Sequence, residues 1–359
     1  MTNEKKLRSG WTTGACATAA TKAAFEALIT GRFPDPVTIS LPKGRTPSFA
    51  VERAELDGAA AQASIIKDAG DDPDVTHGAE IISSVRRLSK GEGVVFKAGE
   101  GVGMVTRPGL PLPVGEPAIN PGPRKMICRA IAEVAEAHDT DGDLEVTISI
   151  ANGAELAEKT MNGRLGIVGG LSVLGTTGVV TPYSCAAWIS AIHRGVDVAR
   201  ASGQTHIAAC TGSTSEKALQ ERLDLPEFAL IDMGDFVGGL LKYLKRHPVE
   251  RLTIGGGFAK LVKLAQGERN LHSKESTVDF DRLAQCFGEA GAPMQMVSEA
   301  KNANTALEVL EKAVAAKIPL GDMIAKLAAK HVRSILPKST EVEVQVFDRQ
   351  GGRVGYADI

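Results

Sequence analysis

Apolar and polar positions in the second half of the chain repeat one pattern three times. Apolar runs at 206–210, 228–232 and 251–255 each lead into a short polar or glycine-bearing loop, and each loop leads into a segment with helical spacing of apolar residues. Strands that alternate with helices in this way predict a parallel sheet of the doubly wound type. Further elements are expected toward the C-terminus: helices at 305–315 and 320–335, and a hairpin of 342–347 with 353–356.

The first half has no such repeat and mixes helices with short strands. An alanine-rich helix is expected at 15–29, capped by Thr12 or Thr13, and a second helix follows Pro123. Strict alternation over 144–150 predicts a half-buried strand. Shorter elements are expected as strands at 37–41, 49–56, 61–67, 79–88, 94–97 and 102–106, and as a helix at 183–193. The predicted fold class is therefore an α+β domain over residues 1–200 and a parallel-sheet α/β domain over residues 201–359.

Composition narrows the class of protein. With 359 residues the chain is long enough for two domains, and its net charge of −2 and 4% aromatic residues argue against a nucleic-acid partner. The five cysteines are far apart and form no metal-ligand spacing, which predicts neither a metal site nor disulfides and fits a reducing compartment. Residues 1–6 lack the apolar core of a signal peptide, and no apolar run approaches the ~20 residues of a membrane span. We expect a cytoplasmic protein without a membrane partner.

The stretch at 162–182 has an unusual density of glycine. Glycine there costs chain entropy without filling a core, so something must approach the backbone closely. Either a neighbouring element packs on it, or it forms a binding surface for an anionic or planar ligand to which Thr176 and Thr177 add hydroxyls. The glycines are Gly163, Gly166, Gly169, Gly170, Gly175 and Gly178.

Three loops are expected at the carboxyl ends of the predicted parallel strands, where α/β sheets bind ligands. The first presents hydroxyls and backbone N–H groups at a helix start, the second a carboxylate suited to a ribose diol, and the third glycines that permit close approach. Singly, Ser213 and Asp235 could be helix caps and the glycines turn formers, but three loops at one edge favour a small-molecule pocket. The candidates are Thr211, Gly212, Ser213, Asp232, Gly234, Asp235, Gly255 and Gly256.

Two loops of the first half carry further polar chemistry. The segment 67–78 places four carboxylates beside His77, either as a solvated acidic turn or as a site where His77 or an aspartate such as Asp71 moves a proton. It lacks the spacing of an EF-hand cation site. The segment 115–124 is stiffened by prolines and delivers Asn120 and Arg124, for ligand contact or to shape a helix entry.

Several blocks taken together resemble the CbiD family, the cobalt-precorrin-5B C1-methyltransferases of cobalamin biosynthesis. They follow one another in order from near the start of the chain to about residue 273, which makes the match far more specific than one motif. One departure is at 256–260, where the family often has Gly-His-x-Gly-Lys and this chain reads Gly-Gly-Phe-Ala-Lys. The matching blocks are 8–14, 67–78, 99–110, 115–124, 159–182, 233–236, 260–264 and 272–273.

The resemblance implies S-adenosylmethionine as methyl donor, a tetrapyrrole acceptor that brings any cobalt as part of the substrate, and a Rossmann-like C-terminal domain. We place the donor at the three sheet-edge loops by topology, and the proton-moving and hydroxyl groups at Asp71, His77, Thr176 and Thr177. A macrocycle with several carboxylates needs basic and polar partners inside the matching blocks. These candidates are Arg8, Thr12, Thr13, Lys67, Arg107, Asn120, Arg124 and Arg164.

Two other functions stay open at this point. A non-catalytic corrinoid-binding protein on the same scaffold would bind the tetrapyrrole without the methyl donor. A small-molecule kinase is suggested by the hydroxyl loop at 211–215, although no G-x-x-x-x-G-K-[ST] phosphate loop is present. The sequence does not decide whether the chain forms a homo-oligomer or whether the acceptor already carries cobalt.

Overall fold

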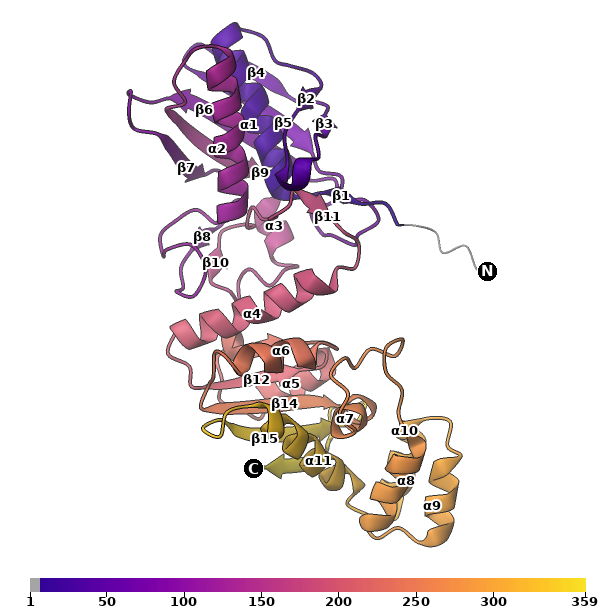
Figure 1. Ribbon diagram of the computed structural model, residues 1–359. Helices are drawn as coiled ribbons and strands as arrows, with labels where there is room; N and C mark the ends of the chain where they lie inside the picture. The colour runs from indigo at the N-terminus through magenta and orange to yellow at the C-terminus, as the bar shows by residue number, and fades with distance from the viewer. Residues whose placement is uncertain (1–6) are drawn as a thin grey trace. The chain divides into compact units, whose positions relative to one another are not determined.

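The computed structural model describes residues 7–359, and the chain divides into two units between Ser184 and Cys185 (Figure 1). We call them unit 1 (up to Ser184) and unit 2 (Cys185–Ile359). The division assigns helix α4 (Cys185–Ala201) to unit 2, whereas the sequence placed a boundary near residue 200. The reason is that Ile192 and Val196 of α4 are buried in the apolar core of unit 2.

The main sheet of unit 1 has five strands in the order β4-β5-β6-β9-β7, antiparallel except for the parallel pair β7–β9. Helix α1 (Thr13–Thr30) packs on β5 and β6 and against helix α2 (Pro121–Ala137), and its run of buried alanines permits close approach to the sheet. Thr12 caps α1, as predicted, by accepting a hydrogen bond from the Ala15 N–H at 3.2 Å. The strands are β4 (Ala54–Asp57), β5 (Ala60–Ile66), β6 (Glu80–Arg87), β7 (Val94–Ala98) and β9 (Leu144–Ile150).

Short antiparallel pairs and loops make up the rest of unit 1. The glycine-rich stretch at 162–182 contains two of these short strands, and it packs tightly on other parts of the same unit. A Cβ atom on Gly170 would lie 2.3 Å from the Gly101 carbonyl oxygen, and one on Gly175 would lie 2.3 Å from Thr12 Oγ1. At these positions the glycines serve close packing. The pairs are β1 (Gly10–Trp11) with β11 (Val179–Val180), β2 (Val37–Thr38) with β3 (Ser48–Phe49), and β8 (Met104–Val105) with β10 (Ile167–Val168); α3 (Gly153–Ala157) and a 3-10 turn, η1 (Pro42–Gly44), complete the unit.

Unit 2 contains the predicted parallel sheet. Its order is β13-β12-β14-β15-β16, so the first strand along the chain, β12, lies between the second and the third. The pairs β12–β13, β12–β14 and β14–β15 are parallel, and β16 closes the predicted hairpin with β15 as an antiparallel edge. The strands are β12 (His206–Cys210), β13 (Leu230–Asp232), β14 (Arg251–Gly257), β15 (Glu341–Phe347) and β16 (Arg353–Asp358).

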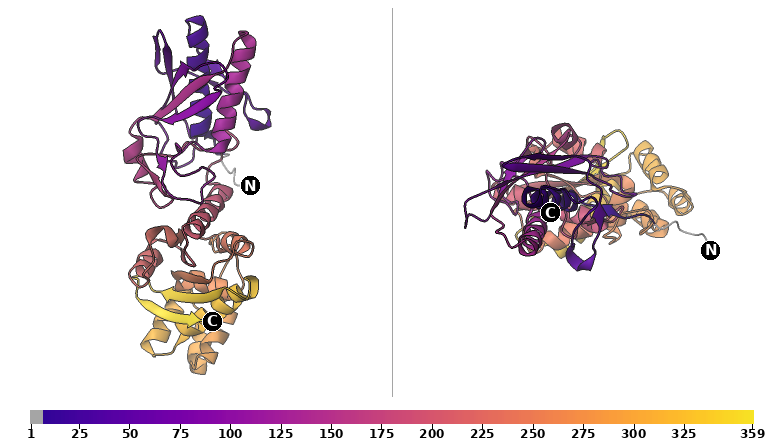
Figure 2. Two further views of the ribbon diagram at one scale, coloured as in Figure 1. Left: turned by 90° about the vertical axis from the view of Figure 1, so that its left-hand side faces the viewer. Right: turned by 90° about the horizontal axis from the view of Figure 1, so that it is seen from above.

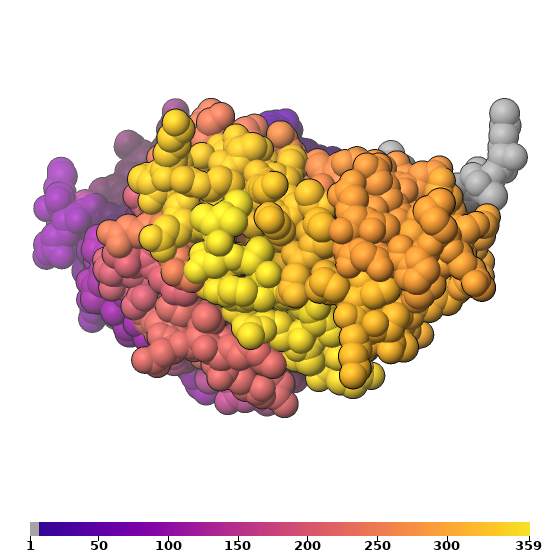
Figure 3. Space-filling model, turned by 90° about the horizontal axis from the view of Figure 1, so that it is seen from below, coloured from indigo at the N-terminus to yellow at the C-terminus, as the bar shows by residue number. Residues whose placement is uncertain are grey.

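Most helices of unit 2 cover one face of this sheet. Apolar side chains of α4, α6, α7 and α11 share one core with the strands, while α5 packs on the other face through Leu219 against Ala208 and Phe347. Figure 2 shows each sheet with its helices from two further directions, and Figure 3 shows α8–α10 in orange beside the yellow C-terminal strands. The helices are α5 (Ser213–Gln220), α6 (Val237–Leu244), α7 (Phe258–Ala265), α8 (Phe280–Glu289), α9 (Met294–Lys301), α10 (Ala306–Ala315) and α11 (Leu320–Ile335), with a 3-10 turn, η2 (Glu227–Ala229). Over residues 7–359, no helix is both long and apolar enough to cross a membrane.

Candidate functional site

Strand register brings the three predicted loops together at the carboxyl edge of the unit 2 sheet. Cys210, the last residue of β12, is in register with Asp232 of β13 on one side and with Gly255 of β14 on the other. Backbone bonds continue past the strand ends, since Thr211 N–H donates to the Gly255 carbonyl and Met233 N–H to the Cys210 carbonyl, both at 3.0 Å. The segments that follow β12 and β13 therefore lie beside the end of β14. The prediction of a third loop at 255–257 was wrong, because these glycines pair with β15 as part of β14, and α7 begins directly after them. We call this region the carboxyl edge.

Lys260 in the first turn of α7 ties the same loops together. Its ammonium donates to the Thr211 carbonyl at 2.7 Å and lies 3.0 Å from Asp235 Oδ1. One side chain thus connects the segments that follow β12, β13 and β14. Sequence reasoning quoted Lys260 in a family motif but gave it no role. The feature of the sequence that could have pointed to this role is a lysine placed directly after a predicted parallel strand.

The glycines of the carboxyl edge have two different environments. A Cβ atom on Gly255 would lie 2.5 Å from Leu219 Cδ1, and one on Gly256 would lie 2.9 Å from Thr211 Oγ1, so neighbouring side chains already fill those positions. Gly212 and Gly257 face open space. A ligand can approach the backbone closely at these two positions, both of which lie in segments that the sequence pointed to.

Ser213 and Asp235 are not helix caps. A capping role was the other interpretation that the sequence left open for them. Gly212 is the N-cap residue of α5, and Ser213 is the first residue of the helix. The N-cap residue of α6 is Phe236, and Asp235 precedes it. Asp235 instead faces Lys260, so its carboxylate already has a cationic partner inside the protein.

In unit 1, three segments converge on one place, which we call the unit 1 junction: residues 8–14, 67–78 and 175–183. Trp11 N–H donates to the Asp68 carbonyl at 2.7 Å, and Thr12 N–H donates to the Gly178 carbonyl at 3.0 Å. A Cβ atom on Gly10 would lie 2.0 Å from the Ala69 carbonyl carbon, so glycine is required there. The junction gathers these predicted site residues: Arg8, Thr12, Thr13, Lys67, Asp71, His77, Thr176 and Thr177.

Two carboxylates of the segment 67–78 neutralise the cations of the junction, Arg8 and Lys67. The Arg8 guanidinium pairs with Asp68, with Nη2 2.9 Å from Oδ1. This hydrogen bond and one from the Gly70 N–H lower the pKa of Asp68 to about 2. Lys67 is 1% exposed and donates to Asp74 and, at 2.5 Å, to Thr76 Oγ1. Burial raises the pKa of Asp74, but the charge and hydrogen bonds of Lys67 outweigh it and hold the pKa below its ordinary value.

The buried position of Lys67 bears on its predicted substrate role. An ammonium that is almost wholly buried and donates to two groups of its own loop stabilises the loop. Thr12 and Thr13 are also buried, and the Thr12 hydroxyl is used in capping α1. The sequence shows that Lys67 is charged, but its burial could not be predicted from the sequence.

The polar site residues of the junction that remain at the surface are Arg8, His77, Asp71 and Thr176. The His77 side chain is 55% exposed, and its Nδ1 accepts a hydrogen bond from the Ala69 N–H at 3.1 Å. Because Nδ1 accepts, the neutral imidazole carries its hydrogen on Nε2, which can donate a hydrogen bond to a ligand. Asp71 accepts from the Arg8 N–H at 2.6 Å, and Thr177 Oγ1 from the Val179 N–H at 3.3 Å.

The remaining predicted residues lie on neighbouring segments of unit 1. Arg124 donates to the Ile119 carbonyl and to Glu116, both at 2.8 Å, and its guanidinium lies 5.1 Å from the centre of the Phe96 ring. It therefore holds the loop that leads into α2, at whose N-cap position lies Asn120. Arg107 packs on Gly166, where a Cβ atom would lie 2.4 Å from Arg107 Cγ, and Arg164 is half-buried in the adjoining turn.

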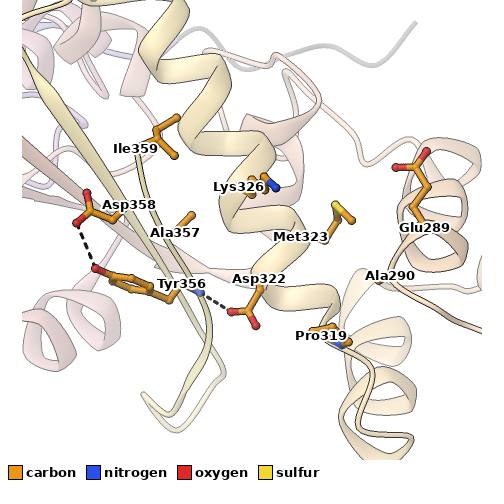
Figure 4. Close-up of a pocket in the computed structure, with 10 residues that line it drawn as sticks. All are labelled: Glu289, Ala290, Pro319, Asp322, Met323, Lys326, Tyr356, Ala357, Asp358 and Ile359. Carbon is orange, nitrogen blue, oxygen red and sulfur yellow. Dashed lines mark hydrogen bonds between the residues drawn. The ribbon is translucent and has the colours of Figure 1, made fainter.

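A hollow of about 450 Å³ lies elsewhere in unit 2, between α11, the end of α8 and strand β16 (Figure 4). Among its polar groups, Asp322 accepts a hydrogen bond from the Tyr356 N–H at 2.8 Å. The open glycines and the Asp232 loop are not among its lining residues. Since volume alone points to no chemistry, the convergent polar loops of the carboxyl edge are the better candidate. Within residues 7–359, no three His, Cys, Asp or Glu side chains form a group that could hold a metal ion.

Comparison with known proteins finds two matching family models, CbiD over residues 1–182 and the CbiD C-terminal domain over residues 270–358. A relative from Rhodospirillum rubrum is 58% identical over 351 residues, covering 98% of this chain and 97% of the relative. One from Bradyrhizobium sp. (strain BTAi1) is 56% identical over 352 residues, covering 98% and 94%. Both are named cobalt-precorrin-5B C(1)-methyltransferase. A crystal structure of the cobalamin biosynthesis protein cbiD from Archaeoglobus fulgidus is 28% identical, covers 75% of this chain and 83% of that chain, and has a TM-score of 0.41.

Proposed function

The chain belongs to the CbiD family, and from that membership we propose that it transfers a methyl group to C1 of cobalt-precorrin-5B, the reaction in its relatives' name. This reaction is a step of cobalamin biosynthesis, and any cobalt enters with the substrate. S-adenosylmethionine is the proposed donor. The relatives are named as methyltransferases, which speaks against the carrier and kinase alternatives.

The carboxyl edge of unit 2 is the proposed donor site, on a Rossmann-like sheet. The observation that carries this proposal is the register around Cys210, because it sets the loops after β12 and β13 beside the point where β14 leads into α7. The strand order reverses between β12 and β14, and ligands of open α/β sheets bind at such points. Open backbone at Gly212 and Gly257 and a carboxylate at Asp232 suit a nucleoside with a ribose diol.

The unit 1 junction is the proposed site for the polyacidic tetrapyrrole. Arg8, whose side chain is 58% exposed, can meet a substrate carboxylate on the side of its guanidinium away from Asp68. Thr176 and His77 add a hydroxyl and an imidazole at the surface. Lys67 keeps the shape of the loop that presents them. Asn120, Arg107 and Arg164 would extend these contacts along the neighbouring segments of unit 1.

When bound, the S-adenosyl donor supplies an electrophilic methyl group and departs as a neutral thioether. The residues of the carboxyl edge would hold the donor by its nucleoside and thereby fix the direction from which its methyl group is offered. Those of the junction would hold the ring by its carboxylates and thereby fix the orientation of the reacting carbon. His77, whose Nδ1 accepts from the Ala69 N–H, would present its Nε2–H as a hydrogen-bond donor to the macrocycle.

The donor assignment is tested by Asp232→Ala and by equilibrium binding of S-adenosylhomocysteine. Loss of hydrogen bonds to the ribose should weaken binding about tenfold or more. Asp281→Ala is the matched control, because Asp281 is an exposed carboxylate of unit 2 on α8 that pairs with Lys301. Unchanged affinity in Asp232→Ala would contradict the donor site. Incubation of the protein with labelled donor and the tetrapyrrole, followed by location of the new methyl group, tests the reaction itself.

A further inference from the structure

Trp188 of α4 has a large exposed surface. Its relative exposure is 47%. Such a surface is unusual in this chain, which has only two tryptophans and 4% aromatic residues. The other one, Trp11, is half-buried and contacts Phe49 edge to face in unit 1. An exposed indole leaves a wide apolar surface in water, which a planar ligand can cover.

The first turn of α4 extends beyond the core of unit 2. Residues 185–188 are all exposed, whereas Ile192 and Val196, one and two turns later, are buried. A Cβ atom on Gly195 would contact Ile231 of β13 at 2.9 Å, so the later part of the helix lies on the strand. Trp188, nearer the start of the helix, contacts the turn that follows this strand. The helix therefore carries its indole to the carboxyl edge.

Contacts with the turn at 232–236 hold the indole in place. Trp188 Nε1 donates to the Asp232 carbonyl at 3.4 Å, and the ring centre lies 6.1 Å from that of Phe236, with a 49° angle between planes. A Cβ atom on Gly234 would lie 3.3 Å from the indole, so this glycine, whose φ is +53°, lets the ring lie on the backbone. A planar surface is thus fixed at the residue proposed for the ribose.

We propose that the Trp188 indole stacks on the adenine ring of the methyl donor. This inference rests on the proposed function and deepens it, because it names the group that recognises the base. A carboxylate for the ribose, an indole anchored to its backbone carbonyl, and open backbone at Gly212 and Gly257 together match the parts of an adenosyl group. Bases stack on aromatic side chains with little dependence on the rest of the ligand. Pre-positioning by Phe236 and Gly234 reduces the entropy cost of stacking.

The test uses the indole itself as the probe. In a Trp11→Phe background, Trp188 is the sole tryptophan, and titration with S-adenosylhomocysteine should quench its emission with the midpoint that calorimetry gives for binding. Trp188→Ala should weaken binding about 5- to 150-fold, the range for loss of one base–aromatic stack. Trp188→Phe keeps an aromatic face and should lose less than about fivefold. Met294→Ala, at an 82% exposed apolar residue of the same unit, is the control and should change nothing.

The outcomes separate the two proposals. If the protein binds S-adenosylhomocysteine, but the Trp188 emission does not change and Trp188→Ala binds equally well, the stacking inference is wrong and the donor assignment stands. If the unaltered protein does not bind S-adenosylhomocysteine, both are wrong. If the emission responds to the tetrapyrrole and not to S-adenosylhomocysteine, the indole belongs to the acceptor and the inference is overturned.

Discussion

The two candidate regions of this molecule are built by different means. At the carboxyl edge of unit 2, strand register sets the loops after β12 and β13 beside the start of α7, and Lys260 of α7 connects them. In the unit 1 junction the loops meet through backbone contacts at Gly10 and Gly70, and carboxylates of the same loop pair with Arg8 and Lys67. The edge is formed mainly by strand register, whereas this junction uses much of its charge to hold its shape.

The largest expected effect is that of Lys67→Met on the stability of unit 1. Removing the buried ammonium leaves Asp74 partly buried without its cation, and breaking such a pair costs about 3–5 kcal/mol. We expect about 3 kcal/mol, the lower end, because the Asp74 side chain is 23% exposed and water can reach it. Urea unfolding followed by Trp11 emission in a Trp188→Phe background measures the free energy of unfolding of unit 1.

Two controls distinguish a structural lysine from a ligand contact. Lys97→Met removes an exposed lysine of β7 and should change the stability by no more than about 0.5 kcal/mol. The double variant Lys67→Met/Asp74→Leu removes both charges and should recover much of the loss. If Lys67→Met unfolds like the unaltered protein but no longer binds the tetrapyrrole, Lys67 contacts the substrate after all, and the contrast between the two regions fails.

The carboxyl edge could be predicted from the sequence because a strand–loop–helix repeat leaves few arrangements. Parallel strands place their following loops at one edge, so Thr211, Asp232 and Gly255 were expected together, and they are. The roles within the edge could not be predicted. Leu219 fills the space beside Gly255, while Gly257 is open, and this depends on side chains that are distant in the sequence.

The unit 1 junction was less predictable, since no periodic pattern relates residues 8–14 to 67–78 or 175–183. The Thr12 cap is local and was predicted, but the burial of Lys67 depends on how a loop with four carboxylates folds. Helices α8 and α9 were missed because they are short amphipathic segments separated by Gly291 and Pro293. Lys260 and Trp188 were overlooked because each acts through contacts with turns far along the chain.

A smaller effect is expected in unit 2 from Lys260→Met. The substitution removes the bonds to Thr211 and Asp235, and hydrogen bonds that involve a charged group contribute about 1.5–3 kcal/mol each. Because these segments would no longer be held together, affinity for S-adenosylhomocysteine should fall about tenfold or more, measured by calorimetry. Lys326→Met, at the hollow near α11, is the control. Equal affinity in Lys260→Met and the unaltered protein would show that register alone forms the edge.

The smallest effect concerns the pH dependence of the Arg8–Asp68 pair. Because the pKa of Asp68 is lowered to about 2 in the folded state, the pair stabilises unit 1 above the ordinary aspartate pKa of about 4, and this contribution is lost as the pH falls through the folded value. The side chains are 58% and 43% exposed, so solvent screening keeps this contribution small. Arg8→Gln keeps the backbone bond to Asp71 and should lower the stability more at pH 6 than at pH 2, where about half of Asp68 is protonated in the folded state. In an Asp68→Asn background the same substitution should have no pH-dependent effect. A stability difference that stays constant from pH 6 to pH 2 would mean that Arg8 acts on the junction through packing and not through its charge.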